Sequence, residues 1–144
     1  LSENLPLNPN PKKLCWGDSR IGNVLFENFQ VKSLLDWEMA TIGDPLCDLA
    51  WGLTTDDVSS HGLNIEKLPG SIANEEAIKF WEKNTGYSAE NFFYYRILCL
   101  FKFSVIMIRV AKKLIHNEIM PLDSDFHVNN HVSNYLRQEF NEKS

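Results

Sequence analysis

The sequence is poor in positive charge and in cysteine. Its 144 residues carry 14 Lys and Arg against 19 Asp and Glu, which gives a formal net charge of −5. Nucleic-acid binding requires a basic face that neutralises phosphates, so this balance disfavours nucleic acid as the main partner. The cysteines, Cys15, Cys47 and Cys99, are odd in number and show no C-x-x-C spacing. This pattern predicts reduced thiols in a cytoplasmic protein and no zinc site.

The sequence also lacks the long apolar runs that membrane insertion requires. A membrane-spanning helix needs about 18 or more uncharged residues, but Lys102 interrupts the longest apolar-rich segment, residues 90–116. This segment is therefore predicted to be a buried central helix. The start of the chain shows no basic segment followed by an apolar one, so no secretory signal is expected and the predicted location is the cytoplasm. We expect no membrane among the partners.

The apolar residues that are present suffice for a packed core. At 44% hydrophobic residues, the chain can form one domain or one lobe of a larger one. Residues 1–13 contain three prolines and three asparagines and are predicted to be an extended lead-in, with the domain at 14–144. Two short apolar runs, 24–26 and 31–35, predict a β-hairpin with a four-residue loop at 27–30.

The rest of the chain is predicted to be mostly helical. Asp44 followed by Pro45 predicts a helix start, because Asp is a good N-cap and Pro suits the first helical position. The polar residues 54–71 are predicted to be a loop. Further helices are predicted at residues 75–84, 90–116 and 127–140. The fold class predicted is α+β, mostly helical, with one small β-hairpin followed by about four helices.

Three oxygen-bearing side chains around the hairpin are the candidates for chemistry. Asp18 is followed five residues later by Asn23, and Asp36 follows the second strand. Phosphoryl transfer from a nucleotide needs a carboxylate for the attacking hydroxyl, and an amide oxygen with a second carboxylate for Mg²⁺. Strand pairing would place Asn23 and Asp36 side by side, as two ligands of one Mg²⁺. The guanidinium of Arg20 could offset charge on the transferred phosphate.

Each of these residues also has a purely structural interpretation. Asp18 and Asn23 are common in turns, Asp36 could cap the turn after its strand, and Arg20 could be a solvated loop residue. Asp48 could lie on a solvated helix face, or it could accept hydrogen bonds from the Asp18 loop.

His127 and His131 have the four-residue spacing that zinc sites use on helices. No Glu stands between them in an H-E-x-x-H pattern, and no third ligand is apparent. The pair therefore favours no metal site.

Two segments resemble a known family. Residues 16–26 (WGDSRIGNVLF) resemble the catalytic loop of the aminoglycoside phosphotransferase/choline kinase family. Residues 35–51 (LDWEMATIGDPLCDLAW) resemble its metal-binding segment and the helix that follows. The subgroup most similar includes domains joined to acyl-CoA dehydrogenases. The similarity covers most of residues 14–136, and residues 15–51 carry nearly all of its specificity.

The resemblance implies the C-terminal lobe of a protein-kinase-like fold. It implies that Asp18 is the catalytic base or the group that orients the hydroxyl, and that Asn23 and Asp36 hold Mg²⁺ with the nucleotide. The donor implied is ATP or GTP, and the acceptor is the hydroxyl of a small molecule. The supporting residues implied are Asp48, which braces the catalytic loop, Glu38, and Trp16, which stands where the family often has His.

The sequence contains no Gly-rich phosphate loop and no strand Lys paired with a helix Glu, so the N-terminal lobe of such a kinase is absent from this chain. We expect the isolated chain to bind nucleotide weakly, to be nearly inactive and to self-associate through its exposed cleft face. A noncatalytic kinase-like binding or scaffold domain, or an inactive fragment, is the alternative function. A protein kinase is disfavoured, because residues 36–38 read D-W-E instead of D-F-G. The acceptor stays open among an amino sugar, a choline-like compound and a hydroxyacyl compound.

Overall fold

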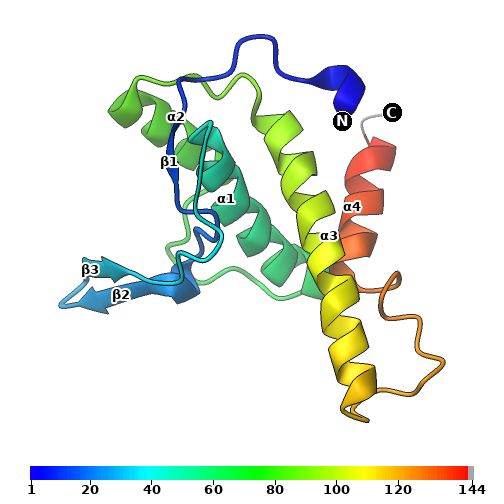
Figure 1. Ribbon diagram of the computed structural model, residues 1–144. Helices are drawn as coiled ribbons and strands as arrows, with labels where there is room; N and C mark the ends of the chain where they lie inside the picture. Colours follow the sequence, from blue (N-terminus) through cyan, green and yellow to red (C-terminus); the bar gives the residue numbers. More distant parts are fainter. Residues whose placement is uncertain (143–144) are drawn as a thin grey trace.

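Four α-helices and four short β-strands make up the computed structural model, which describes residues 1–142. The helices gather into one body, and the β2–β3 hairpin projects from its side (Figure 1). This confirms the predicted α+β, mostly helical fold class. The elements are β1 Lys13–Cys15, β2 Val24–Glu27, β3 Gln30–Leu34, β4 Thr41–Gly43, α1 Leu46–Ser60, α2 Asn74–Thr85, α3 Phe92–His116 and α4 His131–Glu142, with 3-10 turns at Ser2–Asn4, Ile21–Asn23 and His61–Leu63.

The β2–β3 hairpin has a tighter turn than the sequence predicts. The four-residue loop predicted at 27–30 is wrong, because Glu27 and Gln30 pair with each other across the strands. Only Asn28 and Phe29 form the turn, with φ angles of 51° and 61°. Two consecutive positive φ angles match the twist of a two-residue hairpin turn. Phe29 is fully exposed at the tip, and Leu25, Phe26 and Val31 also present apolar surface to solvent.

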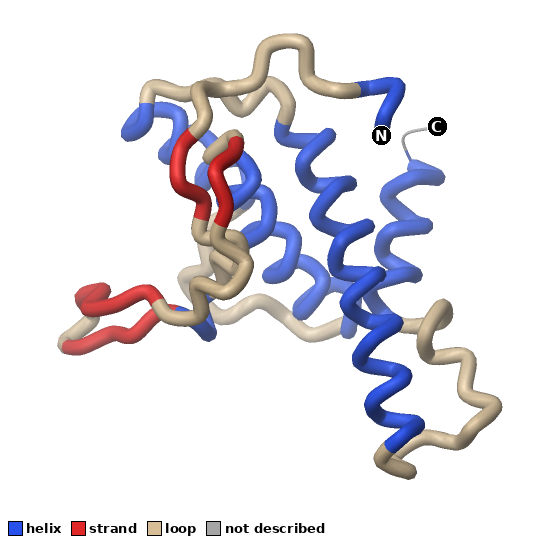
Figure 2. Tube along the Cα trace, viewed as in Figure 1, coloured by secondary structure: helices blue, strands red, loops and turns tan. Residues whose placement is uncertain are grey.

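A second two-stranded sheet, which the sequence does not predict, pairs β1 with β4 in antiparallel register, with Leu14 opposite Ile42. Figure 2 shows this pair apart from the hairpin. Each strand has only three residues, which is too short for a recognisable alternation of apolar and polar residues. The sheet matters for the site because β1 ends at Cys15, immediately before the Asp18 loop.

The core forms where α1 and α3 pack together and α4 packs on α3. Leu46, Ala50 and Val58 of α1, Leu100 of α3 and Val132 of α4 are fully shielded from solvent. Burying a side chain of this size contributes about 1.5–3 kcal/mol. The buried apolar side chains at the start of α1 therefore face α3.

Helix α1 continues beyond the predicted boundary. The predicted loop at 54–71 is wrong in its first part, because α1 runs to Ser60 and a 3-10 turn follows. Several polar side chains in this stretch are buried and hydrogen-bonded, although the buried hydroxyl of Thr54 has no partner among the described residues. Thr55 Oγ1 donates to the carbonyl of Trp51 at 2.9 Å, and Ser60 Oγ donates to the carbonyl of Asp56 at 2.7 Å. Polar composition therefore indicates burial with hydrogen bonding here, and not a loop.

Asp44 links the start of α1 to two distant parts of the chain. The helix begins at Leu46 with Pro45 at the N-cap position, one residue later than predicted. Asp44 Oδ1 still accepts the N–H of Leu46 at 2.9 Å. Asp44 Oδ2 accepts the backbone N–H of Asn10 at 2.9 Å and the hydroxyl of Tyr95 at 3.1 Å. The lead-in, α1 and α3 thus meet at one buried carboxylate.

The ends of α2 and α4 are set by specific capping residues. Gly86, with φ 72°, ends α2 as predicted. Helix α4 begins at His131, four residues later than predicted, because Asn130 Oδ1 accepts the N–H groups of Val132 and Ser133 at 3.1 Å each. His127 lies before the helix, so the two histidines share no helix face. No group of three or more His, Cys, Asp and Glu in the described residues could hold a metal ion.

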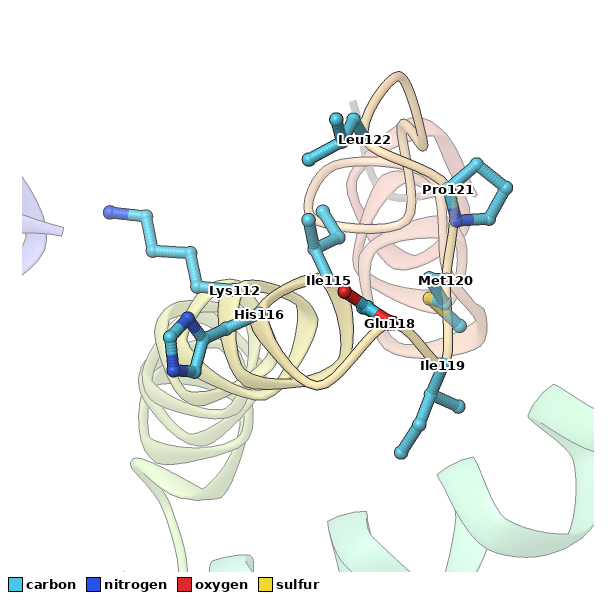
Figure 3. A pocket seen from close by; sticks show the side chains of 8 residues that line it. All are labelled: Lys112, Ile115, His116, Glu118, Ile119, Met120, Pro121 and Leu122. Atoms are coloured by element: carbon cyan, nitrogen blue, oxygen red, sulfur yellow. The ribbon is translucent and has the colours of Figure 1, made fainter.

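Helix α3 matches the bounds of the predicted central helix closely and extends past its neighbours (Figure 1). The prediction that it is buried is correct mainly for its first part, because Phe101, Val105 and Val110 are exposed. The chain turns back at Glu118, where φ is 58°. Within residues 1–142, no helix is both long and apolar enough to cross a membrane. A pocket of about 950 Å³ lies at the end of α3 (Figure 3), lined by Lys112, Ile115, His116, Glu118, Ile119, Met120, Pro121 and Leu122. None of the predicted site residues lines it.

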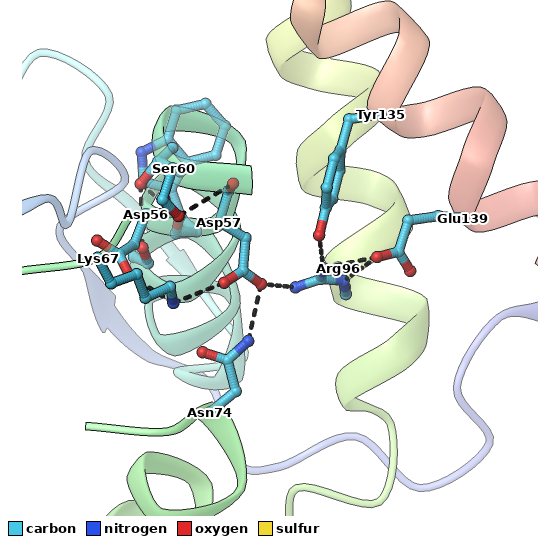
Figure 4. A network of polar contacts seen from close by, with 11 residues as sticks. Asp56, Asp57, Ser60, Lys67, Asn74, Arg96, Tyr135 and Glu139 are labelled. Carbon is cyan, nitrogen blue, oxygen red and sulfur yellow. Dashed lines mark hydrogen bonds and ion pairs between the residues drawn. The ribbon is translucent and has the colours of Figure 1, made fainter. Parts of the chain in front are cut away.

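A buried charge network joins all four helices (Figure 4). The Asp57 carboxylate of α1 accepts hydrogen bonds from Arg96 Nη1 at 2.6 Å, Asn74 Nδ2 at 2.7 Å and Lys67 Nζ at 2.7 Å. Arg96 also contacts Glu139 of α4 at 2.6 Å. Burial alone would raise the pKa of Asp57, but hydrogen bonds from Lys67, Arg96 and Asn74 outweigh it and hold the pKa below its usual value.

The three cysteines are free thiols in the interior or near it. Cys15 and Cys99 are buried, and Cys47 is half-buried. Burial raises the pKa of Cys47 and of Cys99 to about 12. Both side chains therefore stay protonated and unreactive at neutral pH.

Candidate functional site

The Asp18 loop is tied to the first turn of α1 through Asp48. Asp48 Oδ2 accepts the backbone N–H of Trp16 at 2.7 Å, and Oδ1 accepts that of Gly17 at 2.8 Å. Ser19 Oγ donates to the carbonyl of Asp48 at 2.6 Å. One helix residue thus holds the loop on both sides of Asp18, through the backbone before it and through the side chain of Ser19 after it. Asp48 is half-buried, so it does not lie on a solvated helix face.

Two glycines allow the loop to approach its neighbours closely. Gly17 has φ +90°, and a Cβ atom there would collide with the backbone carbonyl of Met39. A Cβ atom at Gly52 of α1 would lie 2.7 Å from the carbonyl oxygen of Ser19. Backbone therefore packs on backbone at these two positions. The Asp18 loop lies close to Met39 on one side and to α1 on the other.

Asp18 is buried, and three side chains donate to its carboxylate. Trp51 Nε1 donates to Oδ1 at 2.7 Å. Asn23 Nδ2 and Arg20 Nε donate to Oδ2 at 2.7 Å and 3.0 Å. Burial alone would raise the pKa of Asp18, but the hydrogen bonds from Trp51, Arg20 and Asn23 outweigh it and lower the pKa. The carboxylate is therefore ionised at neutral pH.

Asn23 and Asp36 are brought together by the base of the hairpin. The N–H of Leu35 donates to the carbonyl of Asn23 at 2.8 Å, one step beyond the Val24–Leu34 pair. Asp36 is therefore the next residue after the partner of Asn23. It is exposed, with φ 58°.

The oxygens of these two residues are available to a ligand. Among the residues that the structure describes, no hydrogen-bond donor or cation pairs with Oδ1 of Asn23 or with the carboxylate of Asp36. The strand pairing places the two residues at neighbouring positions, and an amide oxygen with a carboxylate suits a hard cation such as Mg²⁺, which uses few protein ligands. The residues present therefore fit the metal that the resemblance implies.

Trp16 contacts the Asp36 segment, and Glu38 belongs to it. Trp16 is buried and its Nε1 donates to the carbonyl of Leu35 at 2.8 Å, while its ring centroid lies 6.1 Å from that of Trp37. Glu38 is exposed and lines the same cleft as Asp36. Trp16 therefore connects the Asp18 loop to the Asp36 segment directly.

A cleft of about 990 Å³ is lined by Asp18, Arg20, Asp36, Glu38 and Trp51. The other predicted site residues, Trp16, Asn23 and Asp48, do not line it. Asp18, Asp36 and Glu38 form its acidic end, and Arg20, which is half exposed, lies beside them. One wall belongs to α3 and carries apolar and basic side chains. The residues of that wall are Leu98, Phe101, Lys102, Phe103, Val105, Ile106 and Arg109.

Sequence reasoning missed Trp51 and the basic residues of α3. Trp51 follows Asp48 by three residues, so the two share one face of α1. That spacing is the signal that could have found it. Lys102 Nζ lies 4.7 Å from the ring centroid of Trp51. Nothing in the sequence pattern of α3 indicates that Lys102 and Arg109 face the Asp18 loop.

The comparisons with known proteins show the family and the fold. Residues 1–80 match the model of the family described as "Phosphotransferase enzyme family". The crystal structure of a candidate aminoglycoside phosphotransferase from Ralstonia eutropha JMP134 has a TM-score of 0.63 and 18% sequence identity, and covers 89% of this chain and 40% of that chain. This likeness shows the fold.

Curated relatives carry a much longer chain. Acyl-CoA dehydrogenase family member 11 of Pongo abelii is 33% identical over 117 residues, 74% of this chain and 15% of its own length. The protein of the same description from Gallus gallus is 34% identical over 131 residues, 81% of this chain and 17% of its own. The chain thus spans about a sixth of these relatives. The family model, in contrast, matches more than half of the chain, and it begins at the first residue and includes the whole Asp18–Asp36 region. The chain therefore belongs to the phosphotransferase enzyme family.

Proposed function

We propose that this chain supplies the catalytic half of a small-molecule phosphotransferase, which moves the γ-phosphate of ATP or GTP to the hydroxyl of an alcohol. The observation that carries the proposal is the Asp18 carboxylate, held by three donors in the same cleft as the unpaired carboxylate of Asp36. A fixed base beside a free metal ligand is the arrangement that in-line transfer of a phosphoryl group requires.

Asp18 is placed to accept a hydrogen bond from the acceptor hydroxyl and to orient its oxygen toward the phosphate. Its lowered pKa makes it a weak base. A weak base suits a loose transition state, in which the hydroxyl proton leaves late and orientation contributes most. Arg20 keeps one N–H group on Asp18, and the rest of its guanidinium is available to an anionic phosphate.

Asn23 and Asp36 would hold Mg²⁺ through Oδ1 and a carboxylate oxygen. When bound, the metal ion neutralises charge on the nucleotide phosphates. Asn23 has a second task, because its Nδ2 donates both to the carbonyl of Asp18, at 3.0 Å, and to its carboxylate. Asn23 thus connects the metal ligands to the hydroxyl-orienting group.

The metal assignment predicts where a paramagnetic ion binds. Mn²⁺, which prefers similar oxygen ligands, is expected to broaden the amide NMR signals of residues 18–24 and 34–37 first. Asp36→Asn should weaken this effect at least about tenfold, the scale of loss for residues that support a metal. Asp123→Asn, in an exposed loop outside the cleft, is the matched control and should change nothing. Broadening centred elsewhere, or unaffected by Asp36→Asn, would contradict the assignment.

The test of the function is transfer of labelled phosphate. A full-length protein carrying this sequence is incubated with γ-labelled ATP or GTP, Mg²⁺ and a panel of amino sugars, choline-like alcohols and hydroxyacyl compounds. Products are identified by mass spectrometry. A phosphorylated hydroxyl that depends on Asp18 supports the proposal. Metal and nucleotide binding without transfer to any hydroxyl, or to water, would instead indicate a noncatalytic binding domain.

A further inference from the structure

The Asp18 carboxylate has one place left for a further hydrogen bond. Each carboxylate oxygen offers two lone-pair sites. Oδ2 receives two donors, Asn23 Nδ2 and Arg20 Nε, whereas Oδ1 receives only Trp51 Nε1. Among the described residues, no other side chain donates to Oδ1. The free site is therefore on the oxygen that Trp51 holds.

The indole of Trp51 is itself fixed from several sides. Trp51 is 4% exposed, within the cluster where α1 meets α3. The ring of Phe103 packs at 5.9 Å with an interplanar angle of 45°. Lys102 Nζ lies 4.7 Å from the ring centroid, and a cation over an indole face is attracted by the ring. The N–H of Trp51 therefore points in one direction, set by two residues of α3.

Helix α1 and the Asp18 loop pack closely beside this bond. Gly52, the residue after Trp51, packs directly against the carbonyl of Ser19. The carboxylate is thus gripped from the helix by Trp51 and from the loop by Asn23 and Arg20.

We propose that Trp51 is a positioning residue that sets the orientation of the Asp18 carboxylate and leaves Oδ1 as the oxygen that receives the acceptor hydroxyl. The proposal rests on the proposed function, because it needs a hydroxyl to be oriented. Trp51 acts through Asp18, and the α3 residues Lys102 and Phe103 act through Trp51. The α3 wall of the cleft thus helps to orient the Asp18 carboxylate toward the acceptor hydroxyl.

The kinetic test uses Trp51→Phe, which keeps an aromatic ring and removes the N–H. We expect kcat to fall about 10- to 100-fold, the effect of losing one hydrogen bond to a charged group. The KM for the nucleotide should not change, because Trp51 does not touch the proposed metal ligands. Trp81→Phe is the control: Trp81 lies in the same hydrophobic cluster, next to Tyr87 and outside the cleft, and its loss should leave kcat unchanged.

A double-mutant cycle separates positioning from packing. In an Asp18→Ala background, Trp51→Phe should have almost no further effect on kcat, because Ala has no oxygen that could accept the indole N–H. A reduction of the same size in both backgrounds would overturn the proposal, since it would show that Trp51 acts by packing alone. Unchanged kcat in the single variant would overturn it as well.

An NMR measurement on the 144-residue chain decides the hydrogen bond without any turnover. The four tryptophans give four indole N–H signals, and Trp51→Phe identifies one of them. Asp18→Asn should move the Trp51 signal more than the other three. If it does not, the inference about Trp51 fails whatever the activity. If it does, and the unsubstituted protein phosphorylates no acceptor, the bond stands and the proposed function fails.

Discussion

Replacing Asp18 with asparagine is expected to reduce phosphotransferase turnover by about 100-fold or more, while binding of the Mg²⁺–nucleotide complex stays nearly intact. The change keeps the size of the side chain but removes the charge that accepts the hydroxyl proton, and general-base assistance contributes about 10²–10⁴-fold. The metal ligands proposed, Asn23 and Asp36, are left in place. Initial rates and calorimetric titration of nucleotide, on a full-length protein carrying this sequence, measure the two effects separately.

The amide introduced by this substitution also fits its surroundings less well. Three donors now converge on the carboxylate of Asp18, and an amide has only one oxygen to meet them. Thermal unfolding should therefore be recorded beside the kinetics. Asp123→Asn, an exposed loop position, is the matched control and should retain full turnover. Full turnover in Asp18→Asn would remove Asp18 from the mechanism.

The second large effect concerns stability. Asp57→Ala is expected to lower the free energy of unfolding by about 3–5 kcal/mol, because it leaves the buried guanidinium of Arg96 without its partner on α1. For a chain of this size, that corresponds to a fall in Tm of roughly 6–20 °C. Chemical denaturation followed by circular dichroism measures it directly.

The neighbouring residue provides the control for this prediction. Asp56 also pairs with Lys67, at 2.7 Å, but its side chain is 53% exposed, and exposed pairs contribute about 0–1 kcal/mol. Asp56→Ala should therefore have a small effect. Equal losses from the two substitutions would show that the buried network of Asp57 is not what joins the helices.

The same network gives the protein a defined response to acid. The pKa of Asp57 is lower in the folded state than its ordinary value, so the carboxylate contributes stability at pH values above about 4. This contribution is lost as the pH falls through the lower, folded pKa. Denaturation midpoints measured between pH 6 and pH 2 should fall with pH, and should fall less in Asp57→Ala. A pH dependence that is identical in both proteins would contradict the assignment.

The parts of the fold that the sequence predicts well are those with long, regular patterns. Helix α3 and the end of α2 at Gly86 follow from apolar spacing and from glycine chemistry. The extension of α1 could not be predicted this way, because the stabilising partner of Asp57 is Arg96, 39 residues away. Polar residues usually indicate a loop, but a polar residue that pairs with a distant partner can lie in a buried helix.

In the candidate site too, features set by local sequence could be predicted, and features set by long-range contacts could not. Local spacing and hairpin pairing suffice to suggest that Asn23 and Asp36 lie together. Spacing cannot reveal that Trp51 donates to Asp18, because that bond joins residues 33 positions apart. The contacts of Asp48 with the backbone of Trp16 and Gly17 likewise depend on how α1 docks on the loop. The roles assigned to these residues stay predictions until the variants are measured.

The close packing of Gly52 against Ser19 has a mechanical consequence for the whole cleft. It makes the Asp18 loop and α1 a single stiff unit, whereas residues 34–38 are exposed throughout and carry few buried contacts that resist opening. Residues 34–38 should therefore fluctuate more than the Asp18 loop. Amide hydrogen exchange should be slow on the Asp18 side and fast on the Asp36 side. Any closure around a bound nucleotide would then be a movement of residues 34–38 toward a fixed reference point, and not a mutual adjustment of two flexible walls.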